Sequence, residues 1–206
     1  MKKQKIKNII FDLGGVLIDW NPRYLYDRLL KNDQQKIDYF LSTVCTQTWN
    51  EEQDKGRSFD EGVAILSKKY PEFTELIQAY HTNWEEMLGN TISDTLEILE
   101  HLRKSSYQLY ALTNWSQEKF PFGVKKFEFL RWFKEIMVSG DVQLKKPDPK
   151  IYELLFERFN LVPEESIFID DSVKNVEASR NLGMPGIVFE NGPQLKKALI
   201  DLGIDL

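Results

Sequence analysis

The stretch IIFDLGGVL, residues 9–17, decides the fold of this chain. Its first three residues, Ile9 to Phe11, are apolar and too few for a helix, so they predict a buried β-strand. Asp12 follows directly and places a carboxylate where that strand ends. Similar apolar runs come later in the chain, at residues 109–112, 136–138, 167–169 and 187–189. We therefore predict five buried strands.

Amphipathic segments separate the last three of these runs and predict helices. Asp148-Pro149 provides an N-cap followed by proline in the first turn of one helix. Gly183 ends a second helix, which begins near Ser172. Strands that alternate with single helices pair in parallel through right-handed crossovers. The sequence therefore predicts an α/β fold, with an open, doubly wound parallel sheet covered on both faces.

The interval from Trp20 to Asn90 contains helical patterns and no strand-like run. Asn21-Pro22 starts its first helix, and Ser58 with Glu61 forms a capping box. Helical spacing of apolar residues continues from Phe73 to Leu88. We expect a helical cap domain at residues 20–91, inserted into a core made of residues 1–19 and 92–206, with hinges near residues 19–21 and 89–93.

Composition excludes several classes of function. The 206 residues are 42% hydrophobic and 29% charged, which is typical of a globular protein of one or two domains. The net charge of -5 provides no field that attracts a phosphate backbone, so nucleic acid is not an expected partner. Cys45 is the single cysteine, which excludes an intrachain disulfide and a thiolate-rich zinc site.

The apolar runs also bear on location. None of them approaches the ~20 residues of a membrane-spanning helix, so no membrane partner is expected. The charged start at residues 1–5 resembles the beginning of a secretion signal, but Asp12 interrupts the apolar stretch that follows it. We expect a cytoplasmic protein, as either a monomer or a homodimer.

Polar residues follow each of the first four predicted core strands. They are Asp12, Thr113-Asn114, Ser139 and Asp170-Asp171. The carboxyl ends of parallel strands line the crevice in which such sheets bind ligands, so these groups are expected to converge. A single Asp after a strand is more often a helix cap or a turn residue. The joint occurrence favours a functional site.

Four segments resemble motifs of the haloacid dehalogenase-like hydrolase superfamily, in the order that the family has them. The segments are Phe11–Leu17, Leu112–Asn114, Lys145–Pro149 and Ile169–Ser172. The resemblance covers most of the chain and is greatest to members with a helical cap. It implies a Rossmann-like doubly wound core, Mg²⁺-dependent phosphatase activity and a covalent aspartyl-phosphate intermediate, with Asp12 as the nucleophile.

Oxygen ligands for Mg²⁺ are available at two of these motifs. Asp12 and Asp171 supply carboxylates, the Gly14 carbonyl is a further ligand, and Asp170 supports or joins them. Adjacent carboxylates at a strand end repel each other without a cation or a cap nearby. Capping of the helix that starts at Ser172 is the alternative role of the pair.

Basic and polar residues supply candidate phosphate contacts. Lys146, adjacent to a proline as in the family motif, would pair phosphate oxygens and the nucleophile, whereas Lys145 would be solvated. Thr113 and Asn114 offer hydroxyl, amide and backbone donors. Arg23, just inside the predicted cap, is placed to meet an anionic substrate, and a surface ion pair explains it equally well.

The chain departs from the family pattern at Gly14, where related phosphatases carry a second Asp as general acid and base. Losing a general acid costs roughly 10²- to 10⁴-fold in rate. Asp19, Asp54 or another cap carboxylate would replace it, or the leaving group would need no proton. Carbon–halogen cleavage, known in a metal-free branch of the superfamily, needs no proton either, but Asp170-Asp171 would be costly in a metal-free site.

The sequence thus favours a Mg²⁺-dependent phosphatase acting on a small phosphorylated metabolite, a sugar phosphate being one candidate. Two alternatives stay open. One is a 2-haloacid dehalogenase-type hydrolase. The other is a catalytically weak protein that binds a phosphorylated ligand, because Gly14 replaces the acid.

Overall fold

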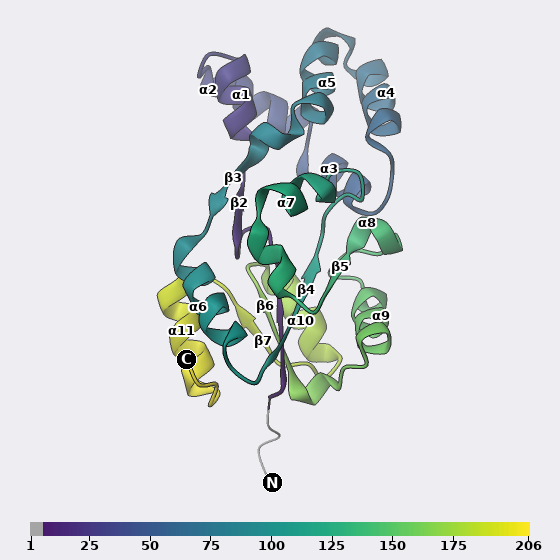
Figure 1. The fold of residues 1–206 in the computed structure, drawn as a ribbon. Helices are drawn as coiled ribbons and strands as arrows, with labels where there is room; N and C mark the ends of the chain where they lie inside the picture. The colour runs from purple at the N-terminus through teal and green to yellow at the C-terminus, as the bar shows by residue number, and fades with distance from the viewer. Residues whose placement is uncertain (1–5) are drawn as a thin grey trace.

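Five parallel strands form the central sheet of the computed structural model, in the order β5-β4-β1-β6-β7 (Figure 1). The strands are β1 (Asn8–Phe11), β4 (Gln108–Thr113), β5 (Glu135–Val138), β6 (Ser166–Asp170) and β7 (Gly186–Val188). The central strand β1 pairs on both sides, with Ile9 opposite Leu109 of β4 and Ile167 of β6. All five predicted strands are confirmed. Asp12 therefore leaves the sheet at its centre.

Helices cover both faces of this sheet, as predicted for a doubly wound fold. Alternate residues of β1 face opposite ways: Ile9 and Phe11 belong to one apolar cluster and Ile10 to another. The first cluster includes residues of α6 (Ser93–Arg103) and α11 (Gly192–Asp201). The second includes residues of α9 (Pro149–Phe159) and the partly buried Ala178 of α10 (Val173–Asn181). The core thus has two separately packed sides.

The predicted helix signals of the core are present in the structure. The Asp148 side chain accepts a hydrogen bond from the Lys150 backbone N–H at 3.0 Å, and Pro149 begins α9. Ser172 is the N-cap residue of α10. Gly183, with φ +84°, adopts a left-handed conformation just after that helix, which favours glycine. Local sequence therefore places these two helices.

Helices above the sheet form the cap (Figure 1). They are α1 (Arg23–Leu29), α2 (Gln34–Tyr39), a π-helix at Phe40–Val44, α3 (Gln47–Asp54), α4 (Phe59–Lys69), α5 (Thr74–Thr82) and short 3₁₀ turns at Pro71–Phe73 and Trp84–Met87. Buried aromatic rings hold the cap together: Tyr26 and Phe40 have ring centroids 4.6 Å apart, and Trp49 meets Tyr80 edge-on at 5.1 Å. These rings belong to the same apolar cluster as Ile9 and Phe11 of β1, so the cap and one side of the sheet share a continuous apolar interior.

A two-stranded antiparallel ribbon joins cap and core, and the sequence analysis missed it. Its strands are β2 (Ile18–Trp20) and β3 (Leu88–Thr91), so the helix predicted to reach Leu88 ends earlier, at Thr82. Neither strand is a continuous apolar run, since β2 reads Ile-Asp-Trp and β3 reads Leu-Gly-Asn-Thr, and their partners lie about 70 residues apart, as Ile18 and Thr91 do. The predicted hinges fall on this ribbon. We propose that residues 20–91 form the cap domain, with the ribbon at its boundary to the core.

Further short elements lie in the connection from β4 to β5 and directly after β5. They are α7 (Phe120–Lys126), a 3₁₀ turn at Glu128–Trp132 and α8 (Ser139–Val142). A further 3₁₀ turn at Pro163–Glu165 precedes β6. Of these elements, α8 follows β5 directly and packs against cap helix α3. The carboxyl end of β5 is therefore close to the cap.

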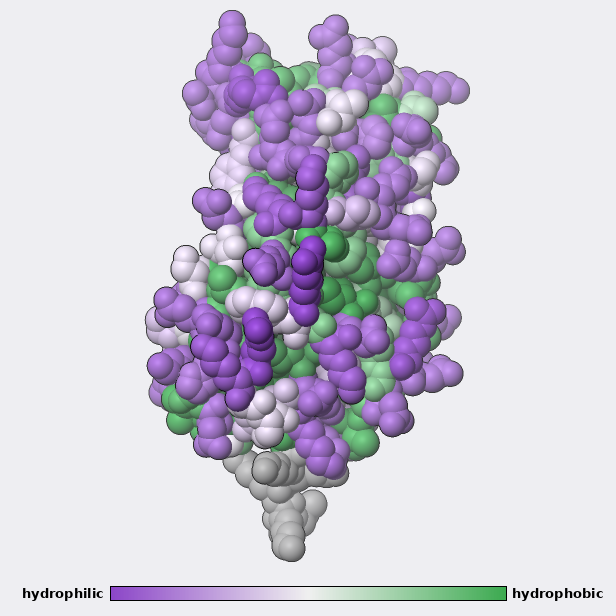
Figure 2. All heavy atoms as spheres, in the orientation of Figure 1, coloured by the Kyte–Doolittle hydropathy of each residue, from purple (hydrophilic) through white to green (hydrophobic). Residues whose placement is uncertain are grey.

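The structure describes residues 6–206, and the charged start at residues 1–5 lies outside them. Within the described part, no helix combines the length and the apolar character that crossing a membrane requires. On the face drawn in Figure 2, hydrophilic side chains cover most of both the cap and the core.

Replacing Phe168 by Ala should destabilise the protein by about 3–5 kcal/mol, because it leaves a cavity in a packed core. Phe168 is fully buried in β6, and its ring meets Tyr152 edge-on at 5.8 Å. Urea unfolding followed by circular dichroism measures the loss. Val173→Ala, at a side chain that is 53% exposed, is the matched control and should change little. Equal effects of both substitutions would contradict this packing.

Candidate active site

A cavity of about 310 Å³ lies between the carboxyl ends of the core strands and cap helix α3. The core side is lined by Asp12, Gly14, Thr113, Asn114 and Asp171. The cap side is lined by Trp20, Gln47, Asn50, Glu51, Asp54 and Trp84. The structure thus brings together the polar residues that follow β1, β4 and β6, although they are far apart in sequence.

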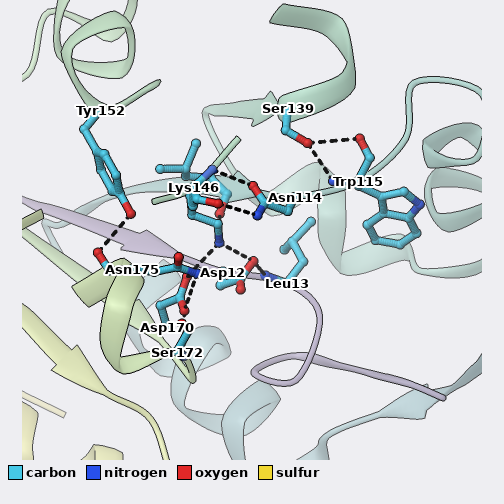
Figure 3. Close-up of polar contacts among 11 residues, drawn as sticks. Asp12, Leu13, Asn114, Trp115, Ser139, Lys146, Tyr152, Asp170, Ser172 and Asn175 are labelled. Atoms are coloured by element: carbon cyan, nitrogen blue, oxygen red, sulfur yellow. Dashed lines mark hydrogen bonds and ion pairs between the residues drawn. The ribbon is translucent and has the colours of Figure 1, made fainter. Parts of the chain in front are cut away.

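The Lys146 ammonium group is the centre of the core wall (Figure 3). It lies 2.8 Å from an oxygen of Asp12 and 2.7 Å from an oxygen of Asp170. It also donates to the Leu112 carbonyl at 2.9 Å. The side chain is 2% exposed, so all three donor protons are directed to protein groups. Lys146 therefore holds the Asp12 carboxylate in place.

Asn114 positions the Lys146 backbone. Its Oδ1 accepts from the Lys146 backbone N–H at 2.8 Å, and its Nδ2 donates to the Lys146 carbonyl at 3.0 Å (Figure 3). The Lys146–Pro147 peptide bond is cis. The Asn114 amide is a predicted phosphate contact, and in the structure both of its polar atoms bond to the Lys146 backbone. Thr113 is buried on the same wall, and phosphate binding by the pair stays a prediction.

Asp170 is fully buried and its two oxygens are engaged by several donors. Besides Lys146, it accepts from the Ser172 backbone N–H at 2.8 Å and from Asn175 Nδ2 at 3.0 and 3.1 Å. Asn175 is in turn held by the Tyr152 hydroxyl, which donates to its carbonyl at 2.9 Å. Asp170 thus holds the residues at the start of α10 and anchors Lys146. Sequence reasoning missed Asn175, although its place in the first turn of α10 was a usable signal.

Three carboxylates meet beside this anchor. Oxygen atoms of Asp12, Asp170 and Asp171 all lie within 4.8 Å of one another. Asp170 is enclosed by its donors, whereas Asp171 is exposed at the pocket. The donor set fits Mg²⁺, which prefers oxygen ligands and keeps several positions for water and substrate. Asp12 and Asp171 are therefore the side chains best placed to hold such an ion.

Gly15 allows the first loop to approach Asp171 closely. Its φ of +75° is left-handed, and a side chain at this position would collide with the Asp171 carboxylate. Gly14, the predicted backbone ligand, lies on the pocket wall, and a Cβ there would meet no atom within 4 Å. The wall next to Asp12 is consequently open.

Burial and neighbouring charges shift the pKa values of Asp12, Asp171 and Lys146. Burial raises the pKa of Asp12 to about 8 in the metal-free protein, with Lys146 opposing and Asp170 adding to the rise. Burial also raises the pKa of Asp171, and Asp170 raises it further. For Lys146, burial lowers the pKa, but Asp12 and Asp170 outweigh it and the net direction is upward. The three carboxylates outnumber the single ammonium group of Lys146. A bound metal ion would neutralise the excess negative charge.

The other candidate residues lie in different surroundings. Arg23 does not line the cavity; its guanidinium pairs with Asp38 and donates to Gln34 at 3.0 Å, so its contact with substrate stays a prediction.

Ser139 is buried, and its hydroxyl bonds to the backbone of Trp115 and Asp54. Asp19 accepts from the Tyr24 hydroxyl at 2.5 Å. Of the cap carboxylates weighed as acids, Asp54 lines the cavity and Asp19 does not.

The fold and site together define a capped α/β enzyme with a carboxylate centre. Comparison with known families agrees. The family model described as haloacid dehalogenase-like hydrolase matches residues 9–189. The chain belongs to this family.

Individual relatives are distant in sequence, and the match covers most of the length of some of them and about a third of another. The chain is 28% identical over 189 residues to a phosphorylated carbohydrates phosphatase of Thermotoga maritima, covering 87% of this chain and 82% of the relative. It is 24% identical over 205 residues to a D-ribitol-5-phosphate phosphatase of Bacteroides thetaiotaomicron, covering 94% and 97%. A match at 24% identity to a drimenol cyclase of Aspergillus calidoustus spans only 36% of that longer protein.

A solved structure has the same fold. The magnesium complex of a family enzyme from Bacteroides thetaiotaomicron superposes with a TM-score of 0.71 at 25% identity, over 91% of this chain and 94% of that one.

Mg²⁺ should stabilise the protein more at about pH 8 than near pH 5. The pKa of Asp12 rises from 3.8 to about 8 on folding, so the metal-free native state holds a proton that the unfolded chain has lost. Its stability therefore falls as pH rises between those values. Mg²⁺ binds the ionised carboxylate and removes this penalty. Thermal melting with and without Mg²⁺ at both pH values measures the difference. An equal rise in melting temperature at both would contradict the assignment of Asp12.

Proposed function

We propose that this chain is a Mg²⁺-dependent phosphatase that hydrolyses a small phosphorylated metabolite through a covalent intermediate on Asp12. The observation that carries the proposal is the position of the Asp12 carboxylate. One of its oxygens is held by Lys146, and the residue lines a cavity that also contains Asp171. A carboxylate fixed in this way can act as a nucleophile toward phosphorus.

Each residue has a task that its surroundings support. Asp12 attacks the phosphorus atom, and Lys146 keeps the carboxylate oriented while its positive charge offsets the negative charge of the phosphoryl group. Asp170 and Asn114 position Lys146, and Thr113 lines the same wall. Asp12 and Asp171, with the Gly14 carbonyl, would hold Mg²⁺. When bound, the ion supplies further positive charge for the phosphoryl oxygens.

The cavity and the relatives support a small polar substrate. A volume of about 310 Å³ is at the lower end of the range for small-molecule sites. Gln47 and Asn50 offer amides, and Trp20 and Trp84 offer rings, which together suit a hydroxyl-bearing substrate. Two relatives are named for phosphorylated carbohydrates and for ribitol phosphate. We propose a sugar or polyol phosphate as substrate. The cytoplasmic location, and the choice between monomer and homodimer, stay predictions of the sequence.

Replacing Asp12 by Asn should abolish turnover, with a loss on the order of 10⁴-fold or more, because the nucleophile is gone. Phosphate release from a panel of sugar and polyol phosphates measures it, and circular dichroism checks the fold. A folded variant that keeps substantial phosphatase activity would rule out the covalent route. Binding of panel compounds without phosphate release by the unmodified protein would instead favour the alternative of a phosphoryl-ligand-binding protein.

Chelation provides an independent test of the metal. EDTA should silence phosphate release, and added Mg²⁺ should restore it, since three carboxylates face a single ammonium group. The same samples are assayed for halide release from 2-haloacids. Halide release that persists in EDTA, without phosphatase activity, would favour the dehalogenase alternative.

A further inference from the structure

The proposed reaction leaves one chemical need that the core wall does not meet. A sugar or polyol alkoxide is a poor leaving group unless its oxygen receives a proton. Next to Asp12, Gly14 offers no side chain, and Lys146 directs its protons to Asp12, Asp170 and the Leu112 carbonyl. Asp171 belongs to the proposed metal site. The proton must therefore come from across the cavity.

Helix α3 presents a polar face to that cavity. Gln47, Asn50, Glu51 and Asp54 line it, at the i, i+3, i+4 and i+7 positions that share one side of a helix. Two of these four residues carry a carboxyl group. Glu51 is paired with Lys145 of the core at 2.5 Å, so its carboxylate is already committed to a salt bridge. Asp54 has no basic side chain bonded to it among the described residues.

Asp54 is firmly placed relative to the core. Its backbone carbonyl accepts from the Ser139 hydroxyl at 2.5 Å, and the same hydroxyl oxygen accepts from the Trp115 backbone N–H at 2.9 Å. Ser139 and Trp115, whose contact is drawn in Figure 3, follow β5 and β4. The Ser139 bond to Asp54 therefore ties the end of α3 to the carboxyl edge that carries Asp12. Asp54 is 8% exposed and lies on the cavity wall.

We propose that Asp54 is the general acid and base of this enzyme, an inference that rests on the phosphatase function proposed above. In the first step the Asp12 carboxylate bonds to phosphorus, the ester P–O bond breaks, and the departing oxygen takes the Asp54 proton to give the alcohol. In the second step Asp54, now a carboxylate, takes a proton from water as the water oxygen bonds to phosphorus. The P–O bond to Asp12 breaks, inorganic phosphate leaves, and both side chains return to their starting states.

The surroundings of Asp54 suit a group that must carry and release a proton near neutrality. Burial raises its pKa to about 7; Glu51 adds to the rise, whereas Lys145 and the Ser116 backbone N–H oppose it. From α5, Tyr80 is the titratable neighbour and stays neutral, since burial raises its pKa well above the usual value. Asn50 donates to Asp54 at 3.0 Å, and its buried Oδ1 has no partner among the described residues. An amide can turn to serve either the ionised or the protonated acid.

The test compares two substrates that differ in their need for a proton. Glycerol phosphate releases an alkoxide, whereas 4-nitrophenyl phosphate releases a stabilised phenolate. Asp54→Asn should lower kcat/KM for glycerol phosphate by roughly 10²- to 10⁴-fold and leave kcat/KM for 4-nitrophenyl phosphate within a few-fold of the unmodified enzyme. Asp60→Asn, at an exposed carboxylate of α4, is the matched control and should leave both values unchanged.

A measurement on the unmodified enzyme makes the test independent of the variant's folding. The ratio of kcat/KM for glycerol phosphate to that for 4-nitrophenyl phosphate should fall as pH rises through the pKa of Asp54, because only one substrate needs the protonated acid. A ratio that stays flat with pH, or an Asp54→Asn variant that loses both substrates equally, overturns the role of Asp54. Absence of phosphate release from either substrate by the unmodified enzyme would instead refute the phosphatase function itself.

Discussion

The buried ammonium group of Lys146 is the interaction on which the site depends. Taking charges out of water is costly, and only close pairing with good geometry offsets that cost. Lys146 meets this condition with two carboxylates, at 2.8 and 2.7 Å, and a backbone carbonyl. It contacts Asp12 directly after β1, Leu112 near the end of β4 and Asp170 at the end of β6, so it fixes the three strand ends relative to each other. The arrangement still leaves an excess of negative charge, which suits a divalent cation.

The cap turns this charged edge into an enclosed site. The core alone supplies the carboxylates and the lysine, while the opposite wall comes from α3, the ribbon and Trp84. The salt bridge between Lys145 and Glu51 crosses from core to cap. The Ser139 hydroxyl makes a second crossing, to the Asp54 carbonyl. Chemistry on the core side and leaving-group contacts on the cap side are therefore held in one geometry.

Much of the fold was predictable because the core strands are buried on both faces. Continuous apolar runs such as Ile167–Ile169 mark these strands directly. The ribbon strand β3 contains Gly89 and Asn90 and so has no continuous apolar run. It forms a strand because it pairs with β2, which lies far away along the chain. For the same reason the sequence did not predict the two hydrogen bonds between the Asn114 amide and the Lys146 backbone. Nothing local in residues 112–114 shows that a loop 32 residues later will lie within hydrogen-bonding distance.

The sequence by itself determined the doubly wound α/β class, the inserted helical region and the set of polar residues at the strand ends. These features are local, since periodicity, capping residues and the position after a strand can be read within a few neighbouring residues. The family motif already favoured Lys146 over Lys145 and Asp171 over Asp170. The tertiary structure alone decided that Lys145 pairs with Glu51, that Asn114 bonds to the Lys146 backbone, and that Asp54 is, among the described residues, the cap carboxylate without a basic partner on the cavity wall. Those choices depend on burial and on contacts between distant segments, which one-dimensional spacing does not contain.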